Sequence, residues 1–228
     1  MVDMEWPDAL RGSFRIELRA EAISLAERGW PILPGTVPTS GTDAEDVTAV
    51  GAAGAVNSPR PEPLHADWSE RLGAHPRQIA AWFTGKQCSL LVATGTMVDA
   101  IEVGDELGRR AASLLRGTGH PAPIVAMPNG RWLFLTTSAG TVHRALADHA
   151  DVTWHGEGSY VPLPPTPYGQ GVVHWRVKPA IWGWRLPSAS SVHEVLVRAL
   201  LGEHADTPAA AVADLNPLDQ PATAPSVA

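Results

Sequence analysis

The segment from His155 to Thr166 places the narrowest limits on the fold of this 228-residue chain. Gly156 and Gly158 permit a positive φ or a close backbone approach, and the Tyr-Val pair that follows them favours an extended strand. Pro164 and Pro165 have no N–H to donate, so the pairing of that strand must stop there. The sequence therefore predicts a short strand that ends at a rigid, exposed rim, of the kind that holds a ligand or covers a cleft.

The composition is that of an ordinary globular protein. Hydrophobic residues make up 44% of the chain and charged residues 18%, and 228 residues are enough for one sizeable core. No run of about 18 apolar residues occurs, and the N-terminus is acidic and polar, so the sequence indicates neither a membrane span nor a signal peptide. We therefore expect a cytoplasmic protein without a membrane partner.

Cysteine usage excludes two kinds of site. Cys88 is the single cysteine, so the chain has no internal disulfide and no multi-cysteine zinc site. Because Cys88 lies inside an apolar segment, we expect a buried structural thiol.

The charge balance argues against a broad nucleic-acid surface. The formal net charge is -7, and only Lys86 and Lys178 are lysines, so arginines supply the other basic groups. Non-specific affinity for DNA comes largely from Lys and Arg side chains that neutralise phosphates. Any tight binding of DNA must therefore be local or supplied by a partner.

Composition shifts divide the chain. Residues 34–63 are rich in Gly, Ala, Thr, Ser, Pro and Asp, and the end of the chain is rich in Ala and Pro. We expect an N-terminal extension at 1–13, a single domain from 14 to 202 that carries an irregular insertion at 34–63, and a disordered tail at 203–228.

Apolar periodicity predicts both helices and strands within that domain. The continuous apolar run at 88–93 is typical of a fully buried central strand, and Asn129-Gly130 is a strong hairpin signal. Helices are expected at 14–28, 76–83, 105–115, 141–148 and 190–201, and strands at 30–33, 88–93, 97–103, 124–127, 131–136, 152–155, 159–163 and 171–175.

Four segments resemble, in the same order, the N-terminal domain of the bifunctional DNA primase/polymerase (Prim-Pol) family. Residues 22–34 are similar to its opening helix and first strand, and 89–95 to its hydrophobic strand ending in Thr-Gly. Residues 128–134 are similar to its Gly-Arg-His-Leu-Tyr strand, and 155–175 to its glycine-flanked strand with paired prolines before a Trp-containing strand. The resemblance implies an α+β fold of the primase-polymerase-like (RRM-like) kind, with a mixed, mainly antiparallel sheet and flanking helices.

The resemblance also implies a chemistry. A polymerase of this kind holds two divalent ions, Mg²⁺ or Mn²⁺, roughly 4 Å apart between clustered carboxylates. In the family, an Asp-x-Asp or Asp-x-Glu pair lies at the end of a strand, a His on the hairpin strand contacts the triphosphate, and a further Asp lies on a later strand.

The acidic pair is incomplete in this sequence. Glu102 falls at the first acid position, and Gly104 falls at the second. Asp99 and Asp105 are each three residues from Glu102, so on a regular strand they point to the opposite face. The residual catalytic candidates are Asp99 and Glu102, and no metal ligand set is evident.

The other two family positions also differ. Trp132 stands where the family has its His, and no carboxylate aligns confidently within 152–155, where His155 lies. Arg131 is suited to a phosphate and Trp132 to a base, and Lys178 flanks a Trp-rich segment. Arg131, Trp132, His155 and Lys178 are therefore the candidates for binding a nucleotide or nucleic acid.

Three functional hypotheses follow. The first is a Prim-Pol-like domain that has lost most or all nucleotidyl transfer and still binds a nucleoside triphosphate or DNA in replication or repair. The second is an active DNA primase/polymerase that recruits Asp99, Glu102 or Asp105 through a bulged strand and uses Mg²⁺ or Mn²⁺. The third is an interaction scaffold that binds a replication protein through the Trp-rich edge at 179–187.

Overall fold

The computed structural model describes residues 8–38, 60–85, 87–119 and 122–202. Most of the predicted insertion, residues 39–59, and the whole predicted tail, residues 203–228, lie outside these ranges. The predicted extension overlaps a helix, because the first helix already begins at Asp8. Both ends of the predicted insertion are paired, since Gly35 ends a strand and forms a β-bridge with Pro63.

The described residues form helices and strands that follow the predicted order closely. In chain order they are α1 (Asp8–Ala26), β1 (Ile32–Gly35), η1 (Trp68–Arg71), α2 (Pro76–Trp82), β2 (Ser89–Ala93), β3 (Val98–Gly104), α3 (Asp105–Thr118), β4 (Ile124–Ala126), β5 (Arg131–Thr137), α4 (Arg144–Ala147), β6 (Val152–His155), β7 (Tyr160–Pro162), β8 (Pro167–Tyr168), β9 (Gly171–Val172), β10 (His174–Val177), η2 (Pro179–Trp182) and α5 (Ala189–Leu200). None of the helices within the described ranges is long and apolar enough to cross a membrane.

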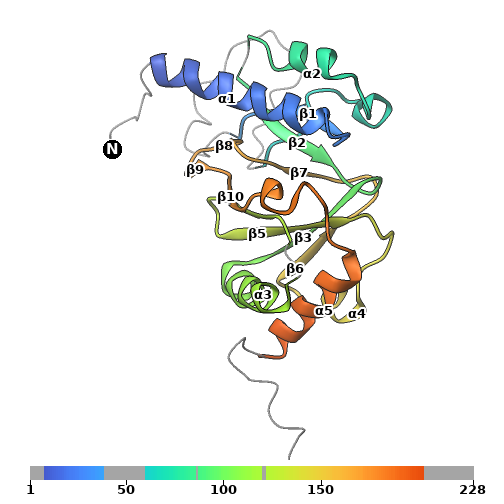
Figure 1. Ribbon diagram of the computed structural model, residues 1–228. Coiled ribbons are helices and arrows are strands. Elements are labelled where there is room, and N and C mark those ends of the chain that lie inside the picture. Colours follow the sequence, from blue (N-terminus) through green and yellow to red (C-terminus); the bar gives the residue numbers. More distant parts are fainter. Residues whose placement is uncertain (1–7, 39–59, 86, 120–121, 203–228) are drawn as a thin grey trace, which may run out of the picture.

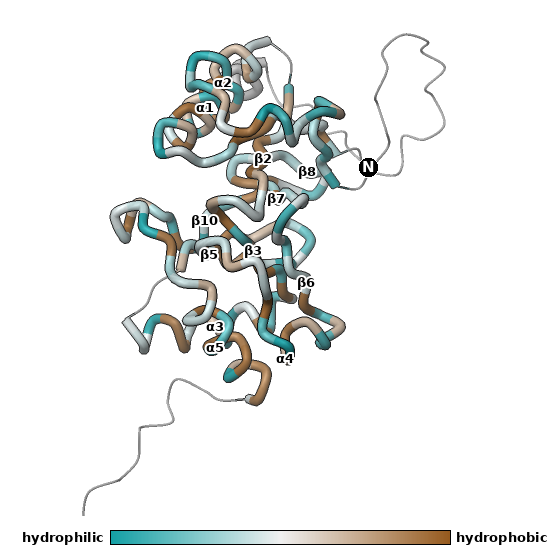
Figure 2. The backbone as a smooth tube through the Cα atoms, turned by 90° about the vertical axis from the view of Figure 1, so that its right-hand side faces the viewer, coloured by the Kyte–Doolittle hydropathy of each residue, from teal (hydrophilic) through white to brown (hydrophobic). Residues whose placement is uncertain are grey.

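The strands form two main sheets that lie one above the other (Figure 1). A three-stranded sheet has the order β1-β2-β7, and a five-stranded sheet has the order β10-β4-β5-β3-β6. Every pairing between these strands is antiparallel. Helices α1 and α2 lie beside the smaller sheet, and α3, α4 and α5 lie at the opposite end of the molecule, beyond the larger sheet (Figure 2). The α+β class with mainly antiparallel sheets and flanking helices is confirmed.

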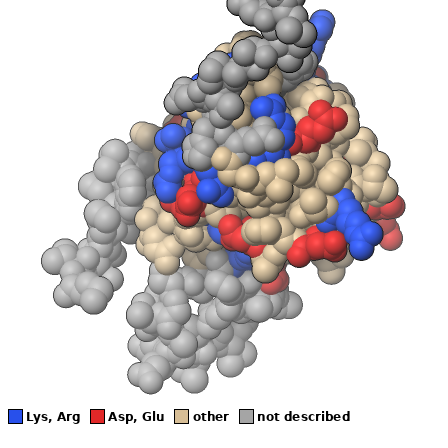
Figure 3. Space-filling model, turned by 90° about the horizontal axis from the view of Figure 1, so that it is seen from below, with Lys and Arg blue, Asp and Glu red and all other residues tan. Residues whose placement is uncertain are grey.

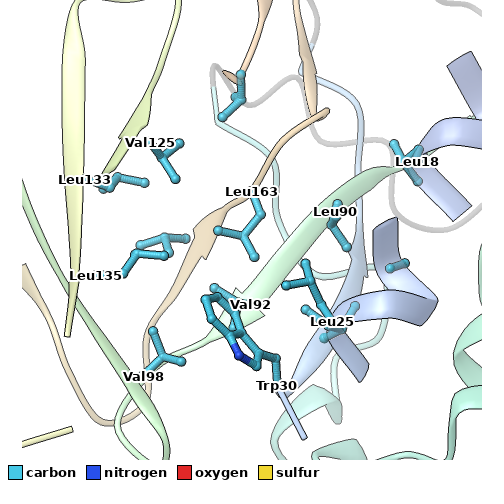
Figure 4. Close-up of a cluster of buried hydrophobic side chains, with 14 of the residues drawn as sticks. Leu18, Leu25, Trp30, Leu90, Val92, Val98, Val125, Leu133, Leu135 and Leu163 are labelled. Carbon is cyan, nitrogen blue, oxygen red and sulfur yellow. The ribbon is translucent and has the colours of Figure 1, made fainter. Parts of the chain in front are cut away.

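The main core lies between the two sheets (Figure 4). Val98, Leu133 and Leu135 project from the five-stranded sheet toward Leu90 and Leu163 of the smaller sheet and the loop after it. Alternate residues of β3 and β5 face the other way and pack on α3 and α5. The central strands β3, β4 and β5 are therefore buried on both faces, which explains their mostly apolar sequences, whereas the edge strands β6 and β10 are partly exposed.

Local signals in the sequence explain several boundaries. The β4–β5 hairpin turns at Pro128-Asn129-Gly130, where Gly130 has φ +78°. Ser188 caps α5, since its hydroxyl accepts a hydrogen bond from the Ser191 N–H at 3.3 Å. The Cys88 thiol is buried, as expected, and burial raises its pKa to about 11.

The segment from His155 to Thr166 joins the two sheets. β6 pairs with β3 in the larger sheet, whereas β7 pairs with β2 in the smaller one. β7 ends at Pro162, and the Leu163 N–H makes one further hydrogen bond to the Leu90 carbonyl before the prolines. Pro164 and Pro165 are buried and do not form an exposed rim. The chain therefore changes sheets through this segment and encloses a cleft between them.

Candidate functional site

A cavity of about 310 Å³ opens where the β6–β7 segment passes between the two sheets. Both tyrosines of the chain, Tyr160 and Tyr168, line it. The other lining residues are Arg60, Pro61, Glu62, Glu102, Met127, His155, Gly158, Ser159, Val161 and Pro162. The cavity thus combines an apolar, aromatic wall with a small set of charged groups, which is the usual character of a small-ligand site.

Glu102 is the buried acid of this cavity. It lies near the end of β3 on the same face as Ala100, and its side chain is only 3% exposed. One carboxylate oxygen, Oε1, accepts a hydrogen bond from Arg131 Nε at 2.9 Å and lies 3.3 Å from Arg60 Nη2. The other oxygen, Oε2, lies 2.9 Å from His155 Nε2. Both carboxylate oxygens are therefore engaged by basic side chains.

These contacts control the ionisation of Glu102. Burial alone would raise its pKa, but the hydrogen bonds with His155 and Arg131 outweigh burial and lower the pKa to about 2. The carboxylate is therefore ionised at neutral pH, and its charge is balanced within the protein.

His155 is held at both ring nitrogens. Its Nδ1 lies 3.2 Å from the hydroxyl oxygen of Ser159, while Nε2 faces Glu102. Because an ionised carboxylate only accepts hydrogen bonds, Nε2 is the donor in the contact with Glu102. His155 therefore has a fixed orientation at the wall of the cavity.

Arg131 links Glu102 to a second acid, Asp151. Its Nη1 donates to Asp151 Oδ1, and its Nη2 donates to the Asp151 carbonyl oxygen at 3.0 Å and to the Glu102 carbonyl oxygen at 3.4 Å. Burial would lower the pKa of Arg131, but the hydrogen bonds to the two acids raise it overall. The guanidinium therefore lies between the two carboxylates.

Asp151 occupies the space beside Gly104, the position that corresponds to the second acid of the family. The Gly104 N–H donates to Asp151 Oδ2 at 3.1 Å. A Cβ atom added at Gly104 would approach that oxygen more closely than real atoms do. The Asp151 carboxylate, from the loop before β6, thus occupies the space that the Cβ atom of an acidic residue at position 104 would need.

Asp99 and Asp105 do not join Glu102. Asp99 is buried on the opposite face of β3, where it accepts hydrogen bonds from the N–H groups of Gly95 and Ala139, both at 3.0 Å. Asp105 begins α3 and pairs with Arg109 at 2.7 Å. The opposed faces agree with the spacing of these residues in the sequence.

Two of the four predicted binding residues lie away from the cavity. Trp132 is paired with Val103 on the face of the sheet that carries the helices, where it packs on Gly108 of α3 and under the Arg176 guanidinium. Lys178 lies at the start of η2 beside a different cavity. Arg131 and His155, by contrast, both contact Glu102.

The site also contains residues that no pattern in the sequence indicated as binding residues. Arg60, Ser159, Tyr160 and Tyr168 line the cavity, and Asp151 completes the Arg131 contacts. The one signal available for Asp151 was its position just before a predicted strand. The contact of Arg60 with Glu102 spans 42 positions, and no local pattern encodes it.

A second cavity, of about 250 Å³, lies between α1 and the Trp-rich segment. The Trp175 indole donates to Glu21 Oε1 at 3.3 Å, and the Arg28 guanidinium lies 3.8 Å from the centre of the Trp184 ring. The lining residues are Glu17, Glu21, Ser24, Pro164, Pro165, Trp175, Lys178, Pro179, Ala180 and Trp184.

The residues of the Glu102 cavity do not fit a two-metal centre. Two divalent ions need several oxygen ligands that converge on each ion. The Glu102 carboxylate is taken by basic side chains, and the Arg131 guanidinium separates it from Asp151. Within the described ranges, no three His, Cys, Asp or Glu residues are grouped so that they could hold a metal ion.

Comparisons with known proteins agree with the fold. No curated protein matches this chain. The family described as bifunctional DNA primase/polymerase, N-terminal (Prim-Pol) matches residues 22–190, a range that runs from α1 to the start of α5 and includes every residue of the Glu102 cavity. The chain therefore belongs to the Prim-Pol family of bifunctional DNA primase/polymerase N-terminal domains.

Proposed function

We propose that this Prim-Pol domain binds a nucleotide unit in the Glu102 cavity and does not catalyse nucleotidyl transfer, and that it serves DNA replication or repair as a binding module. The observation that carries the proposal is the complete engagement of Glu102 by Arg131, Arg60 and His155. A carboxylate whose two oxygens already accept hydrogen bonds from basic side chains is a poor ligand for a catalytic metal ion.

The other acids near β3 do not compensate. Asp99 lies on the opposite face of the sheet, and Asp105 is paired with Arg109. A polymerase must hold one ion near the attacking hydroxyl and another near the leaving pyrophosphate. This arrangement of acids supplies neither position, so loss of catalysis is the simplest consequence.

The cavity still offers contacts for a base and one phosphate. Tyr160 and Tyr168 provide aromatic surface. The ring of Tyr160 packs edge-on against that of Trp68, with 5.7 Å between the ring centres. His155 and Ser159 provide hydrogen-bonding groups on the wall. Arg60 has a side chain that is 59% exposed and lies at the cavity, where it is suited to a phosphate oxygen.

The formal net charge of -7 also favours a small ligand over a long duplex. Basic and acidic side chains are interspersed on the face seen in Figure 3. Counterion release from a duplex requires many basic groups on one face. A single nucleotide unit, free or at the end of a strand, needs only local contacts.

The two tyrosines provide a direct test. Fluorine NMR of protein labelled with fluorotyrosine contains one signal from each of Tyr160 and Tyr168, and both residues line the cavity. We expect both signals to shift on titration with a deoxynucleotide. Arg60→Ala should weaken that binding by about tenfold, the usual worth of a charged hydrogen bond. Lys178→Ala is the matched control. Because Lys178 lines the second cavity and not the Glu102 cavity, this variant should bind the deoxynucleotide as tightly as the wild type.

Two outcomes would contradict the proposal. Signals that respond neither to deoxynucleotides nor to short single-stranded DNA would exclude nucleotide binding in the cavity. Primer extension with Mg²⁺ or Mn²⁺ that is abolished by Glu102→Ala would show that the domain is an active polymerase.

A second candidate function is binding of a replication protein through the Trp-rich edge. The observation that favours it is the exposure of two large apolar side chains on η2, Ile181 at 64% and Trp182 at 44%. Capture of a replication protein that is lost in the Ile181→Ser/Trp182→Ser variant, but retained in Arg60→Ala, would support this function.

A further inference from the structure

We propose that the Arg131 guanidinium is the resident cation of an acidic site, and that the cleft therefore binds its ligand without a divalent metal. The statement about the ligand rests on the proposed function, whereas the statement about Arg131 does not. The residues of this site differ from those that the metal chemistry of the family requires.

Four oxygen atoms from two residues surround the guanidinium. They are the carboxylate Oε1 and carbonyl oxygen of Glu102, and the carboxylate Oδ1 and carbonyl oxygen of Asp151. Carboxylate and carbonyl oxygens are also the ligands that hard divalent cations prefer. The same oxygens that hold Arg131 thus form a partial ligand set for a cation such as Mn²⁺.

The two acids are held in place independently of Arg131. The Gly104 N–H binds the other Asp151 oxygen at 3.1 Å, and His155 binds the other Glu102 oxygen at 2.9 Å. Removal of the guanidinium would therefore leave both carboxylates beside each other. The Glu102 side chain is 3% exposed and cannot move into solvent, whereas the Asp151 side chain is 49% exposed and has room to adjust around an ion.

The charge balance explains why a metal is not needed. In the wild type, Arg131 and Arg60 offset the charges of Glu102 and Asp151. A bound Mg²⁺ or Mn²⁺ would have to approach the guanidinium, and the two cations would repel each other. The ligand must therefore enter without the metal that accompanies a nucleotide in a catalytic site.

Uptake of Mn²⁺ tests the role of Arg131 directly. The free-ion EPR signal of Mn²⁺ is measured in the presence of wild-type protein, Arg131→Ser and Arg131→Ser/Asp151→Asn. We expect Arg131→Ser to bind Mn²⁺ more tightly than the wild type by about tenfold or more, which corresponds to at least ~1.4 kcal/mol. The double variant should lose that gain, and Arg176→Ser, which removes an arginine from the other side of the sheet, should behave as the wild type.

Folding of the variants is checked by circular dichroism, because Arg131→Ser leaves two acids without a shared partner. If Arg131→Ser is unfolded in buffer, Arg131→Gln replaces it, and the readout becomes the rise in its thermal unfolding temperature on addition of Mn²⁺. A folded Arg131 variant with no gain in Mn²⁺ binding would overturn the proposal, and so would a wild type that binds Mn²⁺ as tightly as the variant.

The ligand is tested separately with the fluorotyrosine signals. A deoxynucleoside monophosphate is titrated into wild-type protein in EDTA and again in Mg²⁺, and we expect the same Kd in both. A Kd that is about tenfold weaker in EDTA would overturn the metal independence of the cleft. Signals that move in neither condition would refute the proposed function and the metal-free ligand, while the Mn²⁺ comparison would still decide the role of Arg131.

Discussion

Asp99 and Glu102 lie on opposite faces of the five-stranded sheet, although only three residues separate them on β3. Glu102 faces the cleft between the two sheets and contacts its basic residues. Asp99 faces the other way and receives hydrogen bonds from two backbone N–H groups in loops at the end of the sheet. Of the two residual catalytic candidates, Glu102 therefore lines the cavity, whereas Asp99 forms hydrogen bonds with two loops on the other side of the sheet.

This division predicts that Asp99 matters for stability and not for ligand binding. Asp99→Asn keeps the shape of the side chain but turns one acceptor into a donor that faces an N–H group. We expect a loss of about 1–3 kcal/mol in the free energy of unfolding, measured with urea, and no change in the fluorotyrosine titration. Asp105→Asn, an exposed acid on the same segment, is the control and should change stability little. Loss of ligand binding in a folded Asp99→Asn protein would contradict this assignment.

Thr166 takes over the pairing that the prolines interrupt. Its hydroxyl accepts a hydrogen bond from the Leu90 N–H at 2.8 Å and lies 2.9 Å from the Leu90 carbonyl oxygen, at a fully buried position. Thr166→Val removes the partner of the Leu90 N–H, whereas the Leu90 carbonyl oxygen still accepts from the Leu163 N–H at 2.8 Å, so we expect a loss of about 1–3 kcal/mol in the free energy of unfolding. Thr166→Ser keeps the hydroxyl and should lose less. Equal destabilisation by the two substitutions would show that the methyl group, and not the hydrogen bonds, carries the effect.

The low pKa of Glu102 predicts a specific loss of stability in acid. Its pKa is about 2 in the folded protein and 4.5 ordinarily, so the unfolded chain takes up this proton first as the pH falls. The contribution is fully present above pH 4.5 and is lost progressively down to about pH 2. The difference between the two pKa values corresponds to about 3 kcal/mol.

Urea unfolding between pH 7 and pH 3 measures that contribution. Glu102→Gln removes the titrating group, so the variant should be less stable than the wild type at pH 7, and the gap should narrow at pH 3. Glu106→Gln, at a side chain that is 79% exposed, should follow the wild-type pH dependence. A gap that stays constant with pH would contradict the role given to the Glu102 charge.

Much of the fold was predictable because its determinants are local. The apolar run of β2, the Asn129-Gly130 turn and the parity of Asp99 and Glu102 are each encoded within a few residues. The face of Trp132 was not predictable in the same way, because it depends on the register that pairs Trp132 with Val103. That pairing places the ring on the helices and away from the cavity.

The rest of the site depends on contacts between distant parts of the chain. Arg60 lies in the segment between β1 and β2, and its guanidinium contacts the Glu102 carboxylate. Asp151 lies in the loop before β6, and its carboxylate accepts a hydrogen bond from the Gly104 N–H. The Asp151 contact follows from the pairing of β6 with β3 in the larger sheet. The Arg60 contact joins the segment that bridges to β1 of the smaller sheet with β3 of the larger one. The sequence predicted a glycine at the second acid position, but not that the Asp151 carboxylate lies beside that glycine.

The contact between Asp151 and Gly104 predicts the outcome of placing an acid at position 104. Gly104→Asp would place its Cβ against Asp151 and bring a third carboxylate beside Glu102, while Gly104 itself has φ -65°, which any residue can adopt. We therefore expect the substitution to lower the free energy of unfolding by about 2–4 kcal/mol through crowding and repulsion, without backbone strain. Asp151→Ala frees the same space, so the Gly104→Asp/Asp151→Ala variant should lose less than the sum of the two single variants in urea unfolding. Strictly additive losses would mean that Asp151 does not occupy the position beside Gly104.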